Sequence, residues 1–148
     1  MTLKQYKPYT KSTRSTILVD RSDLWKGKPY KPLTAPNKSV KGRNNMGRIT
    51  SRNHGGGHKQ KYRIIDFYRK KFDVSASVQR IEYDPNRSCH IMLVKFDDGE
   101  NAYYLAPQKV KVGDKIQSGP NAEIKIGNAL PLQDIPVGIN IHNVELQP

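Results

Sequence analysis

Hydrophobic and polar residues follow different patterns in the two parts of this chain. Residues 1–60 show no sustained hydrophobic period, and Pro and Gly interrupt them repeatedly, from Pro8 to the triple glycine at 55–57. From Lys61 onward, short apolar runs alternate with turn signals at intervals of roughly 8–12 residues, without a long helical period. This pattern predicts an extended arm over residues 1–60 and a small β-domain over residues 61–148.

The β-domain is expected to contain several short strands joined by tight turns. Strands are predicted at residues 62–67, 74–83, 90–96, 101–105 and 115–117, with 124–126 and 139–146 as further short strands. In the second strand the alternation slips, so that Ile81 and Tyr83 are also expected to face the core. The Asp84-Pro85 and Asp98-Gly99 pairs predict turns, because proline presets φ and glycine tolerates positive φ.

Two further short elements are expected, one in the arm and one near the C-terminus. The β-branched residues of 15–19 favour a brief strand within the arm, and residues 129–134 can form one helical turn before Pro136. The number and spacing of the strands indicate a small barrel or sandwich. A five-stranded OB-fold barrel suits this length and binds oligonucleotides.

Positive charge is concentrated in the first half of the chain. Overall, 26 Lys and Arg residues oppose 13 Asp and Glu residues, a formal net charge of +13. Residues 1–72 hold 19 basic and 3 acidic side chains, whereas residues 73–148 hold 7 and 10. Such an asymmetry predicts that the first half binds a polyanion. The alternative is a solvated basic face that aids solubility, although self-repulsion on this scale favours a counter-surface.

Several classes of protein are disfavoured by the remaining composition. Cys89 is the only cysteine, so no internal disulfide can form. No apolar run reaches the roughly 18 residues that a membrane span needs. The first 16 residues lack the apolar core of a signal peptide, and their scattered lysines imitate a transit peptide only loosely, since Pro8 interrupts any amphipathic helix.

The segment 41–63 carries the richest candidate chemistry. It alternates Lys and Arg with Gly, Asn, Ser and His. The guanidinium fork binds phosphate through two parallel hydrogen bonds, glycine lets the backbone approach closely, and Asn or His can read base edges and 2′-hydroxyls. The predicted RNA contacts are Arg43, Asn44, Arg48, Arg52, His54, His58, Lys59, Lys61 and Arg63. The alternative is a flexible glycine linker.

A second basic patch with interleaved aromatic residues follows. Arg69, Lys70 and Lys71 come directly after Phe67 and Tyr68, so that cations can meet phosphates while a ring stacks on a base. Arg80 and Arg87 can extend the same surface. The alternative for this patch is a solvated hairpin tip. Of Tyr103 and Tyr104, one is expected in the core and one on the surface.

Candidate metal and catalytic sites are weak. His54 and His58 could pair on a metal, but zinc needs two further ligands, and Cys89 and His90 would point to opposite faces of a strand. No serine lies in a Gly-x-Ser-x-Gly elbow, and the glycine run lacks the Gly-Lys-Ser/Thr ending of a phosphate-binding loop. We therefore expect no metal, no cofactor and no enzymatic activity.

Longer motifs identify a family resemblance. The runs Gly42-Arg43-Asn44-Asn45-x-Gly47-Arg48-Ile49-Thr50 and Gly55-Gly56-Gly57-His58-Lys59-Gln60 resemble the universal large-subunit ribosomal protein family called L-two. The similarity continues through Glu82-Tyr83-Asp84-Pro85-Asn86-Arg87-Ser88 and ends with His142-Asn143-Val144-Glu145. It spans nearly the whole chain and corresponds to the N-terminal half of the family.

The resemblance implies a structural constituent of the large ribosomal subunit, with an rRNA-binding arm and an OB-fold domain. Its implied partners are large-subunit rRNA and other large-subunit proteins. The family also has an SH3-like barrel and a C-terminal extension near the peptidyl-transferase region, which would begin where this chain stops, at Pro148. We expect either a separate chain that carries this half or a ribosome that lacks it.

The split arrangement is similar to that of some mitochondrial ribosomes. Because the resemblance begins near the N-terminus, we expect no cleavable presequence. A mitochondrial large subunit is therefore the expected location, with the bacterial cytoplasm as the alternative. A different class of function also stays open: a free-standing OB-type protein that binds single-stranded RNA through stacking aromatic residues. A small hydrolase is disfavoured, because no catalytic constellation is visible.

Overall fold

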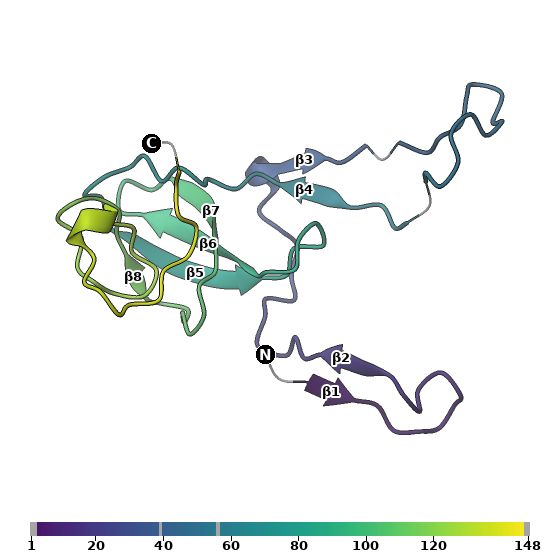
Figure 1. The fold of residues 1–148 in the computed structure, drawn as a ribbon, viewed down its shortest axis with the longest axis horizontal. Helices are drawn as coiled ribbons and strands as arrows, with labels where there is room; N and C mark the ends of the chain where they lie inside the picture. The colour runs from purple at the N-terminus through teal and green to yellow at the C-terminus, as the bar shows by residue number, and fades with distance from the viewer. Residues whose placement is uncertain (1–2, 39, 56, 147–148) are drawn as a thin grey trace.

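The computed structural model of the chain describes residues 3–38, 40–55 and 57–146. A curled β-sheet forms the body, and two β-hairpins extend away from it (Figure 1). Gly56, in the middle of the triple glycine, lies outside the described residues, as do the first two residues of the expected arm and the last two of the expected β-domain.

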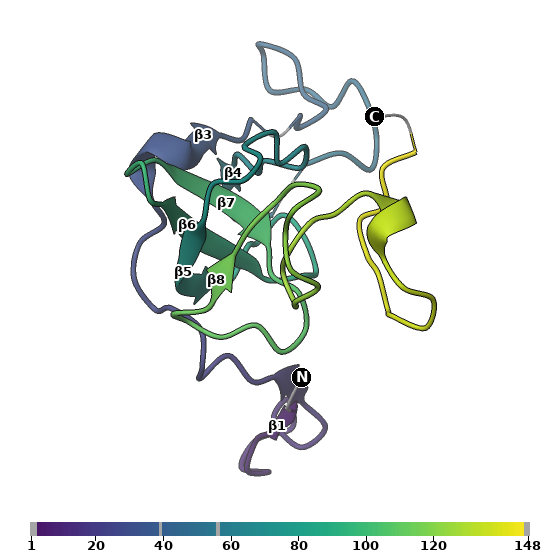
Figure 2. The same cartoon turned by 90° about the vertical axis from the view of Figure 1, so that its left-hand side faces the viewer.

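The body is built on a four-stranded antiparallel sheet with the strand order β7–β6–β5–β8. Its strands are β5 (Ala76–Glu82), β6 (Ile91–Phe96), β7 (Asn101–Leu105) and β8 (Lys115–Ile116). Each lies within a predicted strand range. The sheet curls into a half-barrel (Figures 1 and 2), which confirms the prediction of a mainly β, OB-like fold.

The predicted slip in alternation is a β-bulge in β5. The register against β6 shifts between Val78 and Arg80. Beyond the bulge, Glu82 faces inward and is buried, whereas Tyr83 is 37 % exposed. The expected core position is confirmed for Ile81, which packs against the core, and is wrong for Tyr83, because Tyr83 lies beyond the last residue of β5, Glu82.

Apolar side chains pack on both faces of the sheet. The larger cluster contains Ala76, Val78, Met92, Val94, Phe96, Tyr104, Val110 and Ile116. A smaller cluster on alternate positions contains Ile65, Ile91, Leu93 and Tyr103, and Tyr30 and Leu33 of the arm pack against it. Tyr103 and Tyr104 are therefore both buried. The expectation that one of them lies on the surface is wrong, because the arm covers the second face.

The arm consists of two hairpins joined by a linker. Strands β1 (Leu3–Gln5) and β2 (Ile17–Val19) pair with each other, which confirms the predicted strand near residues 15–19. After a short 3₁₀ turn, η1 (Lys31–Leu33), strand β3 (Thr34–Pro36) pairs with β4 (Lys61–Arg63). Of the expected strand at 62–67, only the first two residues are in a strand, and they belong to β4, the second strand of the β3–β4 hairpin. The expected boundary between residues 60 and 61 falls inside that hairpin.

The C-terminal segment differs most from the prediction. Residues 124–126 and 139–146 form no strand, and only a 3₁₀ turn, η2 (Leu132–Asp134), occupies the expected helical turn. Val137, Ile139 and Leu146 are exposed. An alternating segment becomes a strand only when a neighbouring strand satisfies its backbone groups. Among the described residues, 139–146 has no such neighbour, so the main sheet contains four strands where five were expected.

Candidate nucleic-acid interface

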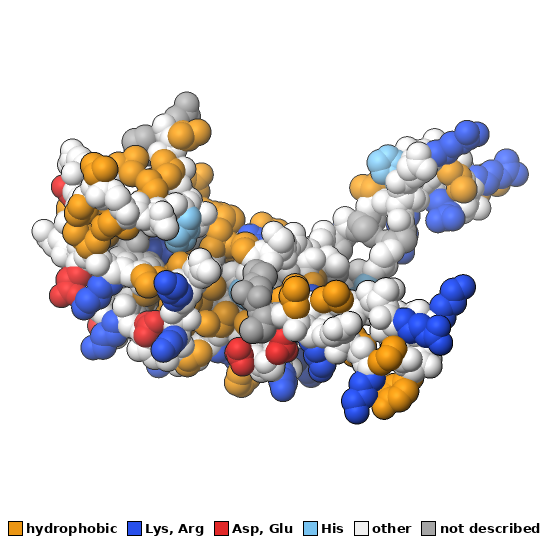
Figure 3. All heavy atoms as spheres, turned by 60° about the horizontal axis from the view of Figure 1, so that its bottom comes forward, with side chains coloured by type: hydrophobic (Ala, Val, Ile, Leu, Met, Phe, Trp, Pro, Cys, Tyr) orange, Lys and Arg blue, Asp and Glu red, His pale blue; other side chains and the backbone are white. Residues whose placement is uncertain are grey.

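Lysine and arginine side chains gather at the ends of the two hairpins. Figure 3 shows them at the protruding tips, whereas acidic side chains are interspersed on the body. Residues 37–60, between β3 and β4, contain six Lys and Arg and no Asp or Glu. A net positive surface that projects from a compact body is suited to a polyanion.

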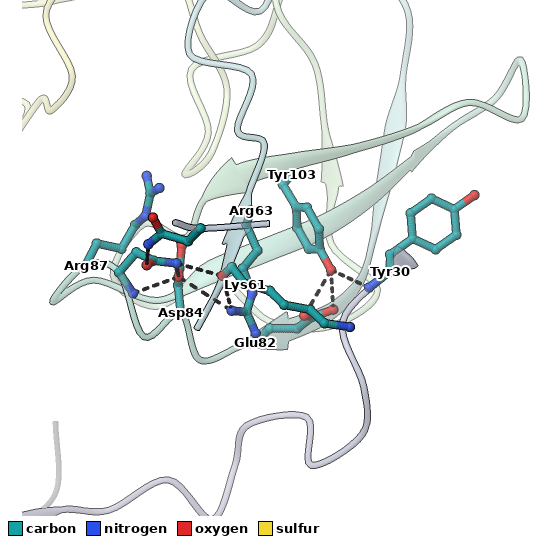
Figure 4. Close-up of polar contacts among 9 residues, drawn as sticks. Tyr30, Lys61, Arg63, Glu82, Asp84, Arg87 and Tyr103 are labelled. Atoms are coloured by element: carbon teal, nitrogen blue, oxygen red, sulfur yellow. Dashed lines mark hydrogen bonds and ion pairs between the residues drawn. The ribbon is translucent and has the colours of Figure 1, made fainter. Parts of the chain in front are cut away.

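A buried carboxylate anchors the root of the β3–β4 hairpin to the body (Figure 4). Asp84 is fully buried and accepts hydrogen bonds from Arg87 Nε at 2.7 Å and from the Asn86 amide at 3.0 Å. Arg63 Nη1 lies 4.0 Å from the same carboxylate. Asn86 Nδ2 donates to the Lys61 carbonyl at 2.8 Å, which ties β4 to the turn that follows β5. The hairpin therefore leaves the body in a defined direction.

A second network holds the other side of the arm. The Tyr30 backbone N–H donates to the Tyr103 hydroxyl at 2.8 Å, and this hydroxyl donates to the Glu82 carboxylate at 3.0 Å. Arg80 Nε donates to Glu82 Oε1 at 2.6 Å. Burial raises the pKa of Tyr103. The protonated phenol can therefore serve as both donor and acceptor in this network.

The distal end of the β3–β4 hairpin is folded back on itself. Asn44 Oδ1 accepts hydrogen bonds from the amides of Met46 at 3.0 Å and Arg48 at 2.9 Å. The Gly42 carbonyl accepts from the amide of Thr50 at 2.8 Å. Asn44, predicted as an RNA contact, thus has a structural role, because its side-chain oxygen organises the turn that presents Arg43 and Arg48.

A shallow concave surface lies on this distal loop. It is lined by Lys41, Arg43, Ile49, Thr50, Ser51, Arg52, Asn53 and His54. The fold therefore brings together three of the predicted contacts, Arg43, Arg52 and His54, and adds Lys41. Arg48, His58, Lys59 and Lys61 are also exposed on the same hairpin. All of these basic and imidazole side chains are accessible to a ligand.

The predicted contacts on the body are largely engaged within the protein. Arg69 Nη1 donates to the Gly127 carbonyl at 2.5 Å, its guanidinium lies 4.3 Å from the centre of the Tyr104 ring, and burial lowers its pKa. Lys71 pairs with Asp98 and Glu100, and the hydrogen bond to Asp98 is the main cause of its raised pKa.

Arg63, Arg80 and Arg87 are similarly paired, with the buried carboxylates of Asp84 and Glu82. Lys70 is exposed, and its ammonium group lies 5.1 Å from the centre of the Tyr68 ring. A cation that is already paired and partly desolvated offers fewer donors to a phosphate. The body therefore contributes a smaller cationic surface than its sequence indicates.

The β1–β2 hairpin was not among the predicted contact residues. Its residues Lys4, Lys7, Lys11 and Arg14 are exposed, and no acidic residue precedes Asp20. Tyr9, between the two strands, is 80 % exposed. In the sequence, the local net positive charge is the signal for this hairpin. The segment contains no glycine and no long motif, which are the features that mark residues 41–63.

No metal site is found in the part of the chain that the structure describes. There, no group of three or more His, Cys, Asp and Glu side chains is placed to hold a metal ion. Cys89 is a free, half-buried thiol. Among these same residues, no helix is long and apolar enough to cross a bilayer.

Comparison with known proteins agrees with this geometry. Over residues 30–118, more than half of the chain, the sequence matches the family described as "Ribosomal Proteins L2, RNA binding N-terminal domain". The chain belongs to this ribosomal protein L2 family. The matched region contains the β3–β4 hairpin and the four-stranded sheet, and it confirms the resemblance seen in the sequence motifs.

Several curated relatives are similar along the whole chain. "Large ribosomal subunit protein uL2" of Pelagibacter ubique is 70 % identical over 149 residues, covering 100 % of this chain and 53 % of the relative. The proteins of the same name from Granulibacter bethesdensis and Acidiphilium cryptum are 60 % and 59 % identical. The two matches cover 54 % and 53 % of these relatives, and 100 % and 99 % of this chain, respectively.

The chain spans about half the length of these relatives. What it shares with the L2 family is therefore the RNA-binding N-terminal domain and the segments that flank it. Membership in a family of structural ribosomal proteins agrees with the expectation that the chain is not an enzyme.

Proposed function

We propose that this chain is a structural constituent of the large ribosomal subunit that binds large-subunit rRNA through its β3–β4 hairpin. The observation that carries the proposal is the distal loop, which is rich in exposed cations, free of acidic residues and mounted on a root fixed by Asp84. Phosphate contacts of this kind position a protein on RNA by shape and charge.

The engaged and the exposed cations have different roles in this proposal. Arg43, Arg48, Arg52, His54, His58, Lys59 and Lys61 contact RNA, with Lys70 as a further contact on the body. Arg63, Arg69, Lys71, Arg80 and Arg87 act first within the protein, where their carboxylate, carbonyl and aromatic partners fix the sheet and the hairpin root.

The partners of the proposed function follow from the ribosomal setting. They are large-subunit rRNA, other large-subunit proteins and a separate chain that carries the C-terminal SH3-like half. The names of the relatives support the ribosomal setting. The relatives come from alphaproteobacteria, which favours the bacterial alternative over the mitochondrial location expected from the sequence. Fractionation of the source cells, followed by mass spectrometry of purified large subunits, distinguishes the two locations and identifies the partner chain.

The hairpin assignment is tested by the salt dependence of RNA binding. Replacing Arg43, Arg48 and Arg52 with Gln removes three charges, so the slope of log affinity against log salt should become shallower by about 2 to 3 units. Filter binding to a fragment of large-subunit rRNA measures it. The matched control replaces Lys95, Lys109 and Lys111 of the body, which are also exposed. Equal changes in both variants would show that only total charge matters, and would reject the assignment.

The second candidate function, a free-standing binder of single-stranded RNA, rests on exposed aromatic residues such as Phe67 and Tyr68. Density-gradient fractionation separates the two functions. A ribosomal constituent sediments with the large subunit after a wash in moderate salt, whereas a free binder stays at the top of the gradient.

A further inference from the structure

We propose that the β1–β2 hairpin is a docking surface for a second protein, which adds an acidic strand to the free edge of β2. The partner is a neighbouring protein of the large subunit, so the inference rests on the proposed function. It goes beyond that function, because it assigns this hairpin to a protein partner and not to RNA. Among the described residues, no third strand pairs with β1 or β2, and the hairpin stands away from the body (Figures 1 and 2).

One face of the hairpin is aliphatic and uncharged. The strand register places Leu3 opposite Val19 and Gln5 opposite Ile17. Because opposite residues share a face and successive residues alternate, these four side chains lie on the same face. Leu3, Ile17 and Val19 are 69 %, 56 % and 39 % exposed. Such a face offers neither a charge to a phosphate nor a ring to a base, so it favours a protein ligand over RNA.

The hairpin by itself is too small to form a stable sheet. Each strand has three residues, and all six residues are exposed. An isolated two-stranded hairpin is at best marginally stable in water, whereas a third strand and an apolar layer stabilise it. The outer edge of each strand also presents backbone N–H and C=O groups, to which an extended segment can add. A partner strand therefore provides both backbone pairing and cover for the aliphatic face.

The charge around the hairpin favours an acidic partner. Residues 3–19 contain four Lys and Arg and no Asp or Glu. A hollow beside the hairpin is lined by all three residues of β2 and by the cations Lys4, Arg21 and Lys26. The acidic residue on its lining, Asp20, already accepts hydrogen bonds from Ser22. Carboxylates of a partner would lie against these cations, whereas a second copy of this chain would bring like charges together.

Apolar and acidic residues should alternate in the added strand. The side chains of a strand point to its two faces in turn, so one set extends the aliphatic face and the other set lies on the opposite face. Lys4 is on that opposite face, since it pairs with Leu18 in the register. The partner segment is therefore expected to be extended, with aliphatic residues at every second position and Asp or Glu between them.

The test is photo-crosslinking in large subunits purified from cells that express the full chain. The photoreactive residue p-benzoylphenylalanine, placed at Ile17 on the aliphatic face, should cross-link to a protein segment with this alternation, which mass spectrometry of the peptides identifies. The same residue placed at Met46, which is exposed on the distal loop of the β3–β4 hairpin, should cross-link to rRNA. The Met46 position therefore tests the proposed function, and the Ile17 position tests the inference.

Two charge variants test whether the partner strand is acidic. Lys4→Glu should lower the yield of the protein cross-link from position 17 at least about threefold, because it sets a carboxylate against the carboxylates of the partner. Lys11→Glu is the matched control. It makes the same change of charge in the exposed loop between the two strands, outside the lining of the hollow, and should lower the yield less.

The outcomes separate this inference from the function on which it rests. A cross-link from position 17 to rRNA, to a second copy of the chain or to a segment without acidic residues overturns the inference. Equal losses in the two charge variants overturn it too, as does the absence of any cross-link from position 17 while Met46 still cross-links to rRNA. A chain that is missing from the large subunit overturns the proposed function, and the inference with it.

Discussion

Tyr103 joins three parts of the chain through one side chain. Its ring packs in the smaller apolar cluster with Ile65, Ile91 and Leu93. Its hydroxyl accepts from the Tyr30 amide and donates to the Glu82 carboxylate. A buried hydroxyl that both donates and accepts stabilises the site. Its removal leaves the Tyr30 amide without its acceptor and takes one of the donors from the Glu82 carboxylate, which keeps Arg80.

Tyr103→Phe should therefore lower the free energy of unfolding by about 1–3 kcal/mol, since the Tyr30 amide and the Glu82 carboxylate lose their common partner. Urea denaturation followed by circular dichroism measures the change. Tyr68→Phe is the control, because Tyr68 is exposed and should change stability by less than about 0.5 kcal/mol. A Tyr103→Phe variant as stable as the control would show that the hydroxyl network is not required.

At the scale of an element, the distal loop of the β3–β4 hairpin depends on backbone geometry more than on packing. Gly42 has a φ of +59°, and a Cβ at this position would collide with the Ser51 carbonyl oxygen. Its own carbonyl accepts from the Thr50 amide. Glycine is required here, because a side chain would both strain the backbone and separate the two sides of the loop.

Gly42→Ala should open the distal loop and weaken RNA binding several-fold without changing the melting temperature of the body, since the strain of about 1–3 kcal/mol falls on the loop alone. RNA titration and differential scanning calorimetry measure the two effects. Gly47→Ala is the matched control: φ is also positive, at +77°, but nothing lies within 4 Å of the added Cβ. It should weaken binding less. If the two variants weaken binding equally, the close approach of Gly42 to Ser51 is unimportant.

At the scale of the whole molecule, the arm carries the proposed RNA-binding loop and also covers one face of the sheet. Tyr30 and Leu33 pack on the second face, and the Trp25 amide donates to the Ile81 carbonyl at 2.8 Å beside the edge of β5. The segment 25–33 therefore belongs structurally to the body. By contrast, the three residues of β1 and the three of β2 are all exposed.

This division predicts different effects for two truncations. Deleting residues 1–20 should change the free energy of unfolding by less than about 0.5 kcal/mol, because the β1–β2 hairpin buries little. Deleting residues 1–33 should lower it by at least about 2 kcal/mol, because it uncovers Leu93 and Tyr103. Equilibrium denaturation of both variants tests this. Similar losses in both would place the stabilising contacts of the arm before residue 21.

Local chemistry was enough to predict much of this protein. The strands at 90–96 and 101–105, the turn at Gly99 and the bulge in β5 follow from side-chain alternation and from glycine, which act over a few residues. The basic segment 41–63 was recognisable because its charges and glycines are contiguous.

Only the tertiary structure decided which cations are free and which segments become strands. Arg63, Arg80 and Arg87 differ from Arg43 and Arg48 not in chemistry but in lying beside a carboxylate, of Asp84 or Glu82, that the fold buries. The alternating pattern of 139–146 allows a strand but supplies no neighbour for it. The burial of these carboxylates and the pairing of strands depend on residues far apart in the chain, and a local pattern does not encode them.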